Sequence, residues 1–308
     1  MKKVFIDGSV GTTGLRIYER LANRSDLTLL TLPDDKRKDP IARKEMLNSV
    51  DVAFLCLPDD AAREAVAMLE NPSVTVIDAS TAHRTQDDWA YGFPELGKAF
   101  EEKLLNAKRI AVPGCHASGF IALVYPLVAN GLLSQDELLS AHSITGYSGG
   151  GKKMIAEYES ENRCKLLDAP RQYGIAQGHK HLPEMVKITG VKNAPVFSPI
   201  VADFYSGMEV TVPLHRKQVN GGIDDIKGVY KALYNGDIVK YAENADESGF
   251  LSAVALGGKD SMQIEVHGND ERILLTARYD NLGKGASGAA IECMNLVIGA
   301  NRTEGLVL

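Results

Sequence analysis

The stretch that decides the fold lies near the start of the chain and reads Val4-Phe5-Ile6-Asp7-Gly8-Ser9-Val10-Gly11-Thr12-Thr13-Gly14. An apolar run leads into glycines spaced G-x-x-G-x-x-G, and a helical pattern over residues 15–23 follows at once. Glycines between a strand and a helix let the backbone approach a pyrophosphate, whose charge is met by N–H groups at the helix N-terminus. The order strand, turn, helix makes the motif more informative than a bare glycine triplet, although a purely structural turn is the alternative. The residues expected at the nucleotide are Gly8, Ser9, Gly11, Thr12, Thr13 and Gly14.

Four more apolar runs follow this motif, at residues 27–32, 52–57, 74–78 and 109–112, and segments with helical character separate them. Strands that read as continuous apolar runs are covered by helices on both faces, as in a parallel sheet built from β-α units. The first ~115 residues are therefore predicted to form an α/β, Rossmann-type, doubly wound parallel sheet.

The pattern changes after Cys115. A helix is predicted from Ser118 to Asn130, and alternating segments follow at residues 196–201, 208–214, 262–267 and 272–279. Alternation of this kind indicates a mixed or antiparallel sheet, and therefore an α+β domain. A last helical segment, residues 286–300, carries small residues on one side and is expected to pack on the first domain. The predicted division is residues 1–116 completed by 285–303 for the dinucleotide-binding domain, and 117–284 for a catalytic and oligomerisation domain.

The composition of the chain argues against several classes of protein. A chain of 308 residues favours two domains. Its net charge of −6 argues against nucleic-acid binding, which needs a concentrated positive surface. The longest apolar run, residues 120–129, is too short to span a bilayer, and Asp7 and Gly8 interrupt the N-terminal apolar stretch too early for a signal peptide. We therefore expect a cytoplasmic protein that binds neither membranes nor nucleic acids. The four cysteines contain no C-x-x-C pair, which argues against a zinc knuckle or a disulfide framework.

The second strand is followed by charged residues that bear on cofactor choice. An acidic residue there binds the ribose 2′-hydroxyl of NAD, and a basic one accepts the 2′-phosphate of NADP. Asp34 and Asp35 come first, and Lys36, Arg37 and Lys38 follow immediately. Because Pro33 ends the strand before the acids, the sequence favours presentation of Lys36 or Arg37 to a phosphate, and hence NADP. A solvated charged loop is the alternative.

Cys115 has the setting of a nucleophile. It follows Pro113-Gly114 at the predicted junction of a strand and a helix, where the helix N-terminus stabilises a thiolate. A pKa of ~8.5 leaves about 3% thiolate at pH 7, whereas a pKa of ~6 gives about 90%. Cys56 and Cys293 lie in a predicted strand and helix and are expected to be structural. A small packed core residue is the alternative for Cys115.

Residues 178–184, Gly-His-Lys-His-Leu-Pro-Glu, concentrate proton-transfer groups just before a predicted helix at 182–188. A thiolate that forms and releases an acyl group needs a residue that moves protons near neutral pH, and histidine suits that task. His179, His181 and Glu184 would also suit a metal site, and a surface turn is a further alternative. His116 is treated as secondary, because neighbouring side chains at a helix start point in different directions.

Several motifs in register resemble the N-acetyl-gamma-glutamyl-phosphate reductases, in particular their shorter form, and more distantly the aspartate-semialdehyde dehydrogenases. The resemblance spans nearly the whole chain. It rests on residues 8–14, Phe54-Leu55-Cys56-Leu57-Pro58, Asp78-Ala79-Ser80-Thr81-Ala82-His83-Arg84, Tyr91-Gly92-Phe93-Pro94-Glu95-Leu96, Pro113-Gly114-Cys115, Gly146-Tyr147-Ser148-Gly149-Gly150-Gly151-Lys152-Lys153, residues 179–184 and Asp280-Asn281-Leu282-Gly283-Lys284-Gly285.

The resemblance implies an NADPH-dependent enzyme of arginine biosynthesis that works on an acyl phosphate as a homodimer or homotetramer. Cys115 would form a thioester that is reduced to the aldehyde, and His181 would be the acid-base residue. Substrate contacts would come from Arg84, His179, Glu184, Ser148 and Gly149, and further cofactor contacts from Leu57, Pro58 and Asn281. One departure is His116-Ala117-Ser118 after the cysteine, where the family commonly has an aromatic residue, Pro or Ala, and Thr. Ser118 is expected to cap the helix.

Three alternatives stay open: a related dehydrogenase acting on another acyl phosphate, an NADP-binding regulator without chemistry, and a metal-dependent hydrolase. Arg84 suits a bidentate clamp on phosphate or carboxylate, with a surface ion pair to Asp87 or Asp88 as its alternative. The glycines at 149–151 form either an anion-binding nest or a flexible turn.

Overall fold

The computed structural model describes all residues, 1–308, and divides them into two compact units. Unit 1 holds Met1–Gly114 and Ala286–Val307, and unit 2 holds Cys115–Gly285 with Leu308. The α/β class with one parallel and one mixed sheet is confirmed. No helix is both long and apolar enough to cross a membrane.

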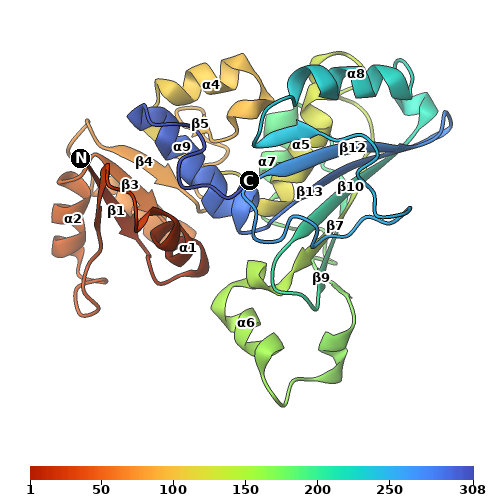
Figure 1. The fold of residues 1–308 in the computed structure, drawn as a ribbon. Coiled ribbons are helices and arrows are strands. Elements are labelled where there is room, and N and C mark those ends of the chain that lie inside the picture. The colour runs from red at the N-terminus through yellow and green to blue at the C-terminus, as the bar shows by residue number, and fades with distance from the viewer. The chain divides into compact units, whose positions relative to one another are not determined.

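Unit 1 is built on a fully parallel sheet (Figure 1) with the order β2-β1-β3-β4-β6-β5. Its strands are β1 (Lys2–Asp7), β2 (Leu27–Leu30), β3 (Val52–Leu55), β4 (Thr75–Asp78), β5 (Ala90–Tyr91) and β6 (Arg109–Ala111). Its helices are α1 (Thr12–Leu21), α2 (Pro40–Asn48), α3 (Asp59–Ala67), η1 (Pro94–Leu96), α4 (Lys98–Leu105) and α9 (Gly288–Ile298). The short strand β5 was not predicted, because two residues carry no periodic signal.

Two apolar clusters cover the two faces of this sheet. Ile17 of α1, Leu104 of α4 and Ala290 of α9 pack on one face, and Leu47 of α2 and Ala62 of α3 pack on the other. Helices on both faces explain why the strands read as continuous apolar runs. The burial of α9 in the first cluster confirms that the last helix packs on the parallel sheet.

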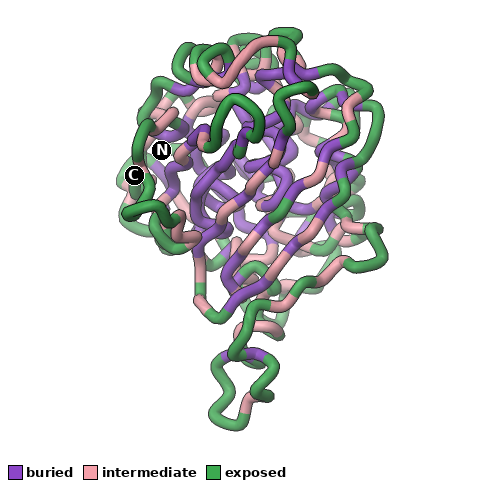
Figure 2. The backbone as a smooth tube through the Cα atoms, turned by 90° about the vertical axis from the view of Figure 1, so that its right-hand side faces the viewer, coloured by how far each residue is buried: buried purple, intermediate pink, exposed green.

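Unit 2 contains a mixed sheet with the order β11-β12-β13-β10-β7-β9-β8. Its strands are β7 (Ser140–Gly146), β8 (Arg171–Gln172), β9 (Val196–Ala202), β10 (Met208–His215), β11 (Val239–Tyr241), β12 (Met262–Gly268) and β13 (Arg272–Tyr279). Its helical segments are α5 (Cys115–Ala129), η2 (Tyr147–Gly150), α6 (Gly151–Glu159), η3 (Lys165–Asp168), α7 (Leu182–Thr189), η4 (Arg216–Gln218), α8 (Ile223–Leu233) and η5 (Gly283–Ser287). Figure 2 shows purple along the strands of this sheet and mostly green on the lobe that carries α6.

Helix α5 is the buried centre of unit 2, and it packs on β10, β13, α7 and α8. Pro126 inside the helix lacks the N–H that would bond to the carbonyl of Ala122. The buried hydroxyl of Tyr234 from α8 donates to that carbonyl instead, at 2.7 Å. The tyrosine therefore satisfies the backbone group that the proline leaves open.

The start of α5 differs from the prediction. The helix begins at Cys115 and not at Ser118, so Ser118 lies inside it and the expected capping role is wrong. A serine before an apolar run is a common helix start, but here the first turn is organised by Tyr279 from β13, as described below. Strands β7, β8 and β11 were also missed, because they are short or rich in small polar residues.

Candidate active site

A cavity of about 180 Å³ in unit 2 brings together residues that are far apart in the sequence. Cys115 from α5 lines it together with His179, Lys180 and His181 from the segment that precedes α7. Its remaining wall is formed by His116, Thr145, Gly146, Gly149, Gly150, Met154, Tyr173 and Val201. The cysteine and the histidine cluster singled out in the sequence therefore share one site.

Cys115 is the first residue of α5, and a tyrosine hydroxyl is inserted between two backbone groups of the first turn of that helix. Tyr279 donates its hydroxyl to the Cys115 carbonyl at 2.5 Å and accepts from the Gly119 N–H at 3.0 Å. These are the two groups that would bond to each other in a regular helix. A Cβ at Gly119 would lie 2.7 Å from the hydroxyl, so only glycine fits. Gly285 also approaches closely, because its Cβ would lie 3.1 Å from that of Cys115.

His116 is buried beside the cysteine and is bonded at both ring nitrogens. Its Nδ1 lies 2.6 Å from the Ser143 hydroxyl and its Nε2 lies 2.6 Å from the Tyr173 hydroxyl. Burial, with smaller contributions from His179 and Lys180, lowers the pKa of His116 to about 3. The ring is therefore neutral near pH 7 and holds the tyrosine hydroxyl at the wall of the cavity.

The rings of His116, His179 and His181 form a compact cluster. His179 lies 4.8 Å from His181 and 5.4 Å from His116 between ring centroids. The backbone N–H of His181 donates to Nδ1 of His179 at 3.2 Å, so this nitrogen carries no proton. Burial and the charge of Lys180 lower the pKa of His179 to about 4. The neutral ring thus keeps its proton on Nε2.

The turn at Ser148 and Gly149 is held by a buried asparagine. The amide nitrogen of Asn281 donates to the Ser148 hydroxyl at 3.0 Å, and its oxygen accepts from the Gly207 N–H at 2.9 Å. The turn is a 3-10 segment that leads into α6. Ser148, Asn281 and the first-turn Glu184 of α7 are all buried, and none of them lines the cavity.

The glycine-rich turn of unit 1 has the shape of a phosphate cradle. Gly8 has φ +87°, and a Cβ there would lie 2.3 Å from the Cys56 carbonyl and 3.3 Å from the Leu57 side chain. A Cβ at Gly14 would lie 2.4 Å from the Gly8 carbonyl. Gly11 is the N-cap of α1 and offers no side chain to its first N–H groups. Those N–H groups, from Thr12 onwards, suit an anion.

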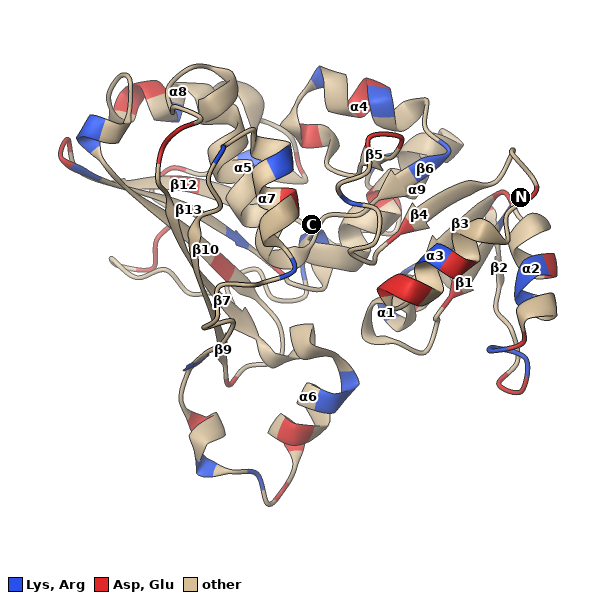
Figure 3. Ribbon diagram, turned by 180° about the vertical axis from the view of Figure 1, so that it is seen from behind, with Lys and Arg blue, Asp and Glu red and all other residues tan.

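The loop after β2 carries charges of both signs (Figure 3). Arg37 forms an ion pair with Asp34 at 2.5 Å, and Lys36 is exposed. Pro58 is the N-cap of α3, directly after Leu57. All the residues assigned from the sequence to the dinucleotide belong to unit 1, except Asn281, which belongs to unit 2.

Arg84 is buried, so a solvated surface ion pair does not describe it. Its guanidinium donates to the carbonyls of Val112 at 2.8 Å and Ala79 at 3.0 Å. His83 before it bonds to Asp78 at 2.6 Å and stacks on Trp89 at 4.1 Å between ring centroids. Arg84 is therefore fixed to the backbone just before Cys115.

The other cysteines have no comparable setting. Burial, followed by the carboxylates of Asp78 and Asp7, raises the pKa of Cys56 to about 12. The sequence predicted that Cys56 lies inside a strand, but it lies just beyond the end of β3. Cys293 is buried in α9, and Cys164 is exposed. No group of three or more His, Cys, Asp or Glu side chains is placed to hold a metal ion.

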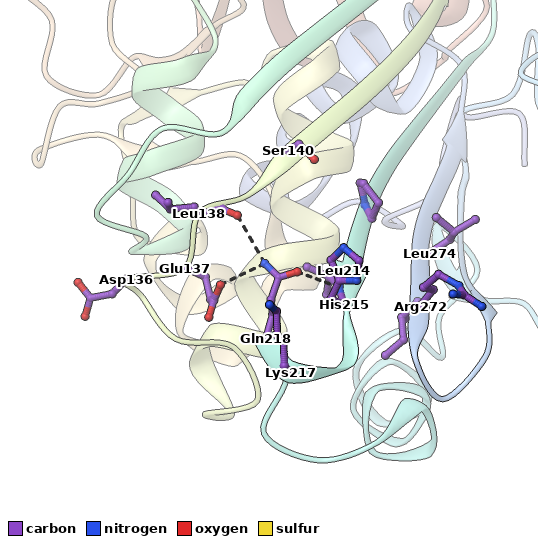
Figure 4. A pocket seen from close by; sticks show the side chains of 12 residues that line it. Asp136, Glu137, Leu138, Ser140, Leu214, His215, Lys217, Gln218, Arg272 and Leu274 are labelled. Atoms are coloured by element: carbon purple, nitrogen blue, oxygen red, sulfur yellow. Dashed lines mark hydrogen bonds between the residues drawn. The ribbon is translucent and has the colours of Figure 1, made fainter.

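A larger depression of about 790 Å³ lies elsewhere in unit 2 (Figure 4). The Gln218 carboxamide donates to Glu137 at 3.1 Å and accepts from the His215 N–H at 2.8 Å. The lining contains no cysteine. Size therefore does not identify the reactive site, and the smaller cavity at Cys115 is the candidate.

Sequence reasoning missed Tyr173 and Tyr279 and gave His116 little weight. Tyr173 comes six residues before His179, but a lone tyrosine in a polar stretch gives no signal. Tyr279 meets Cys115 across 164 positions in the chain. His116 was set aside because neighbouring side chains diverge, yet its ring lines the same cavity as Cys115.

Two family models match parts of the chain. Residues 115–281 match the family model "Semialdehyde dehydrogenase, dimerisation domain", and residues 35–103 match "Semialdehyde dehydrogenase, NAD binding domain". The chain is 44% identical to N-acetyl-gamma-glutamyl-phosphate reductase 2 of Nostoc sp. over 99% of both chains. It is 44% identical to N-acetyl-gamma-glutamyl-phosphate reductase of Burkholderia lata over 96% of both. Aspartate semialdehyde dehydrogenase II of Vibrio cholerae has the same fold, with TM-score 0.74 and 18% identity over 97% of this chain and 98% of that one.

Proposed function

Because the chain belongs to the N-acetyl-gamma-glutamyl-phosphate reductase family, we propose that it reduces N-acetyl-gamma-glutamyl phosphate to N-acetylglutamate 5-semialdehyde and phosphate in arginine biosynthesis. The observation that carries the proposal is the shared cavity of Cys115 and His181, which lie 66 positions apart in the chain. A thiol at a helix N-terminus beside an imidazole is the arrangement that covalent acyl transfer requires.

The reaction begins at the sulfur. The Cys115 thiolate attacks the acyl carbon of the substrate, the bond from that carbon to the phosphate oxygen breaks, and inorganic phosphate leaves with the electron pair. NADPH supplies, when bound, the hydride that reduces the resulting thioester. His181 then protonates the oxyanion of the thiohemiacetal. In the last step the same histidine takes this proton back while the carbon–sulfur bond breaks, which releases the aldehyde and the Cys115 thiolate.

Substrate positioning is assigned to groups with the right charge and hydrogen-bonding capacity. His179 and Gly149 line the cavity, whereas Ser148 and Glu184 are buried and do not line it. Arg84 would contribute a guanidinium for an anionic group, since a planar cation suits carboxylate and phosphate. Each of these substrate contacts is supported by the charge and hydrogen-bonding capacity of the residue and by the resemblance to the family.

NADP is the proposed cofactor, held by the glycine-rich turn and by the loop after β2. The cradle formed by Gly8, Gly11 and Gly14 is closed to any side chain at Gly8 and Gly14, which suits the close approach of a pyrophosphate. Exposed Lys36 and the paired Arg37 would receive the 2′-phosphate, and Asn281 would lie near the nicotinamide. We further propose a homodimer or homotetramer, supported by the match of unit 2 to a dimerisation domain.

Phosphate-dependent reduction of NADP⁺ with N-acetylglutamate semialdehyde tests the proposal, with aspartate semialdehyde as the competing substrate. Cys115→Ala is expected to abolish turnover and His181→Ala to reduce it severely. Cys164→Ala, at an exposed cysteine, is the matched control and should leave turnover unchanged. Ordinary turnover by Cys115→Ala, or a preference for aspartate semialdehyde, would overturn it.

A further inference from the structure

Residues 171–177 run along the outer edge of β9, and this path leads directly to the histidine cluster. Arg171 and Gln172 pair with Val201 and Ile200 as strand β8. Tyr173 then donates its N–H to the Pro199 carbonyl at 3.0 Å. Pro199 has no N–H to return, so the regular backbone pairing ends there.

The next pairing site on this edge is occupied by a side chain. Gln177 donates its Nε2 to the Phe197 carbonyl at 2.8 Å, and its Oε1 accepts from the Phe197 N–H at 2.9 Å. The carboxamide thus replaces the backbone of a strand residue opposite Phe197. The chain reaches it through a turn closed by the Gln177 N–H on the Gly174 carbonyl at 2.9 Å.

The backbone of Gln177 adopts an unfavourable conformation to make these bonds. Its φ is +55°, in the left-handed region that non-glycine residues other than Asn and Asp seldom adopt. Such a conformation has an energetic cost, and surrounding structure must hold it in place. The two bonds to Phe197 offset that cost.

Phe197 connects this anchor to the reactive groups. Its ring lies 5.1 Å from that of His179 and 5.4 Å from that of His116 between centroids. His179 follows Gln177 by two residues, and its Nδ1 accepts from the His181 N–H. Ring contacts to Phe197 and the two residues of chain after Gln177 therefore join the sheet edge to His179, and a hydrogen bond joins His179 to His181.

We propose that Gln177 is a positioning residue for the reaction, because its carboxamide fixes the segment that carries His179 and His181 beside Cys115. This inference rests on the proposed function, since it assigns Gln177 an effect on proton transfer at His181. Displacement of a catalytic group by ~1 Å costs about 100-fold in rate. Loss of both bonds to Phe197 is therefore expected to lower kcat by about 10- to 100-fold.

The test compares Gln177→Ala with Gln172→Ala, which removes an exposed glutamine from the neighbouring strand β8. Gln177→Ala should lower kcat by about 10- to 100-fold, leave the KM for the cofactor within about twofold, and speed hydrogen exchange of the amides at 174–182. Gln172→Ala should change none of these quantities. Equal urea midpoints for the two variants exclude general loss of structure as the cause.

Gln177→Glu adds a readout that loss of structure would not produce. A protonated glutamic acid donates and accepts like the carboxamide, whereas the carboxylate only accepts. The kcat of this variant relative to wild type should therefore rise as pH falls towards ~4.3, the ordinary pKa of glutamate. Gln177→Ala should show no such rise.

Turnover by Gln177→Ala within about twofold of Gln172→Ala would overturn the inference, and so would a pH-independent ratio for Gln177→Glu. If the Gln177 inference fails but Cys115→Ala loses turnover in the same assays, the proposed function still holds. An inactive wild-type protein would instead contradict the proposed function itself.

Discussion

Replacement of His116 by glutamine should change how the stability of the protein depends on pH. The ring of His116 is 3% exposed, and both of its nitrogens bond to hydroxyl groups, which suit a neutral ring of either tautomer. The charged and titratable groups around it are Cys115, Tyr173, His179, Lys180 and His181. Glutamine keeps a donor and an acceptor at this position but does not titrate.

The magnitude follows from the lowered pKa. In the folded protein the pKa of His116 is about 3, compared with an ordinary value of 6.5. Between these values the unfolded chain binds a proton that the folded protein does not, so stability falls as pH falls. The slope approaches about 1.4 kcal/mol per pH unit below pH 6.5, and the loss between pH 6.5 and 4.5 is about 2 kcal/mol, because half of the unfolded chains already carry this proton at pH 6.5. The stabilising contribution is complete about one pH unit above 6.5.

Urea unfolding followed by circular dichroism at several pH values measures this effect. The free energy of unfolding of wild type minus that of His116→Gln should fall by about 2 kcal/mol from pH 6.5 to 4.5, since the effects of the carboxylates that both proteins share cancel. Fluorescence is a poor probe, because the single tryptophan, Trp89, belongs to unit 1. A difference that is constant with pH, or a His116 NMR resonance that titrates near pH 6.5, would refute the reasoning.

Two further predictions concern the fold and the cofactor. Tyr234→Phe removes the donor to the Ala122 carbonyl and should lower the urea-measured free energy of unfolding by about 1–3 kcal/mol, but by much less in a Pro126→Ala background, where an N–H is restored. Equal losses of unfolding free energy in both backgrounds would contradict the role of the Tyr234 hydroxyl at the Ala122 carbonyl. Lys36→Ala should raise the KM for NADPH by about 5- to 10-fold, from roughly 1 kcal/mol of charge interaction, while the KM for NADH stays unchanged. Parallel increases for both cofactors would argue against a 2′-phosphate contact.

The main features of the fold could be predicted from the sequence because they depend on local patterns. The apolar runs, the glycine turn and the helix before Gly190 each carry their signal within a few residues. Alternation in β10 likewise matches its burial pattern. Such patterns report which face of an element is buried, and this largely determines the class of fold.

The remaining features depend on contacts between distant parts of the chain. The start of α5 was placed at Ser118 because Ser118 has a cap-forming side chain, whereas the structure begins the helix at Cys115 beside the Tyr279 hydroxyl. The pairing of Gln177 with Phe197 also has no sequence signature, since exposed glutamines are common in loops. The sequence thus singled out Cys115, His179 and His181, which share one cavity, but not the residues that hold them in place.

Mass spectrometry of the protein incubated with N-acetyl-gamma-glutamyl phosphate in the absence of NADPH tests the central claim most directly. A covalent acyl adduct should form on Cys115, one per chain, and it should be absent from Cys115→Ala. Addition of NADPH should remove the adduct and release the aldehyde. Normal turnover without any adduct on Cys115, or with an adduct on another cysteine, would contradict the account.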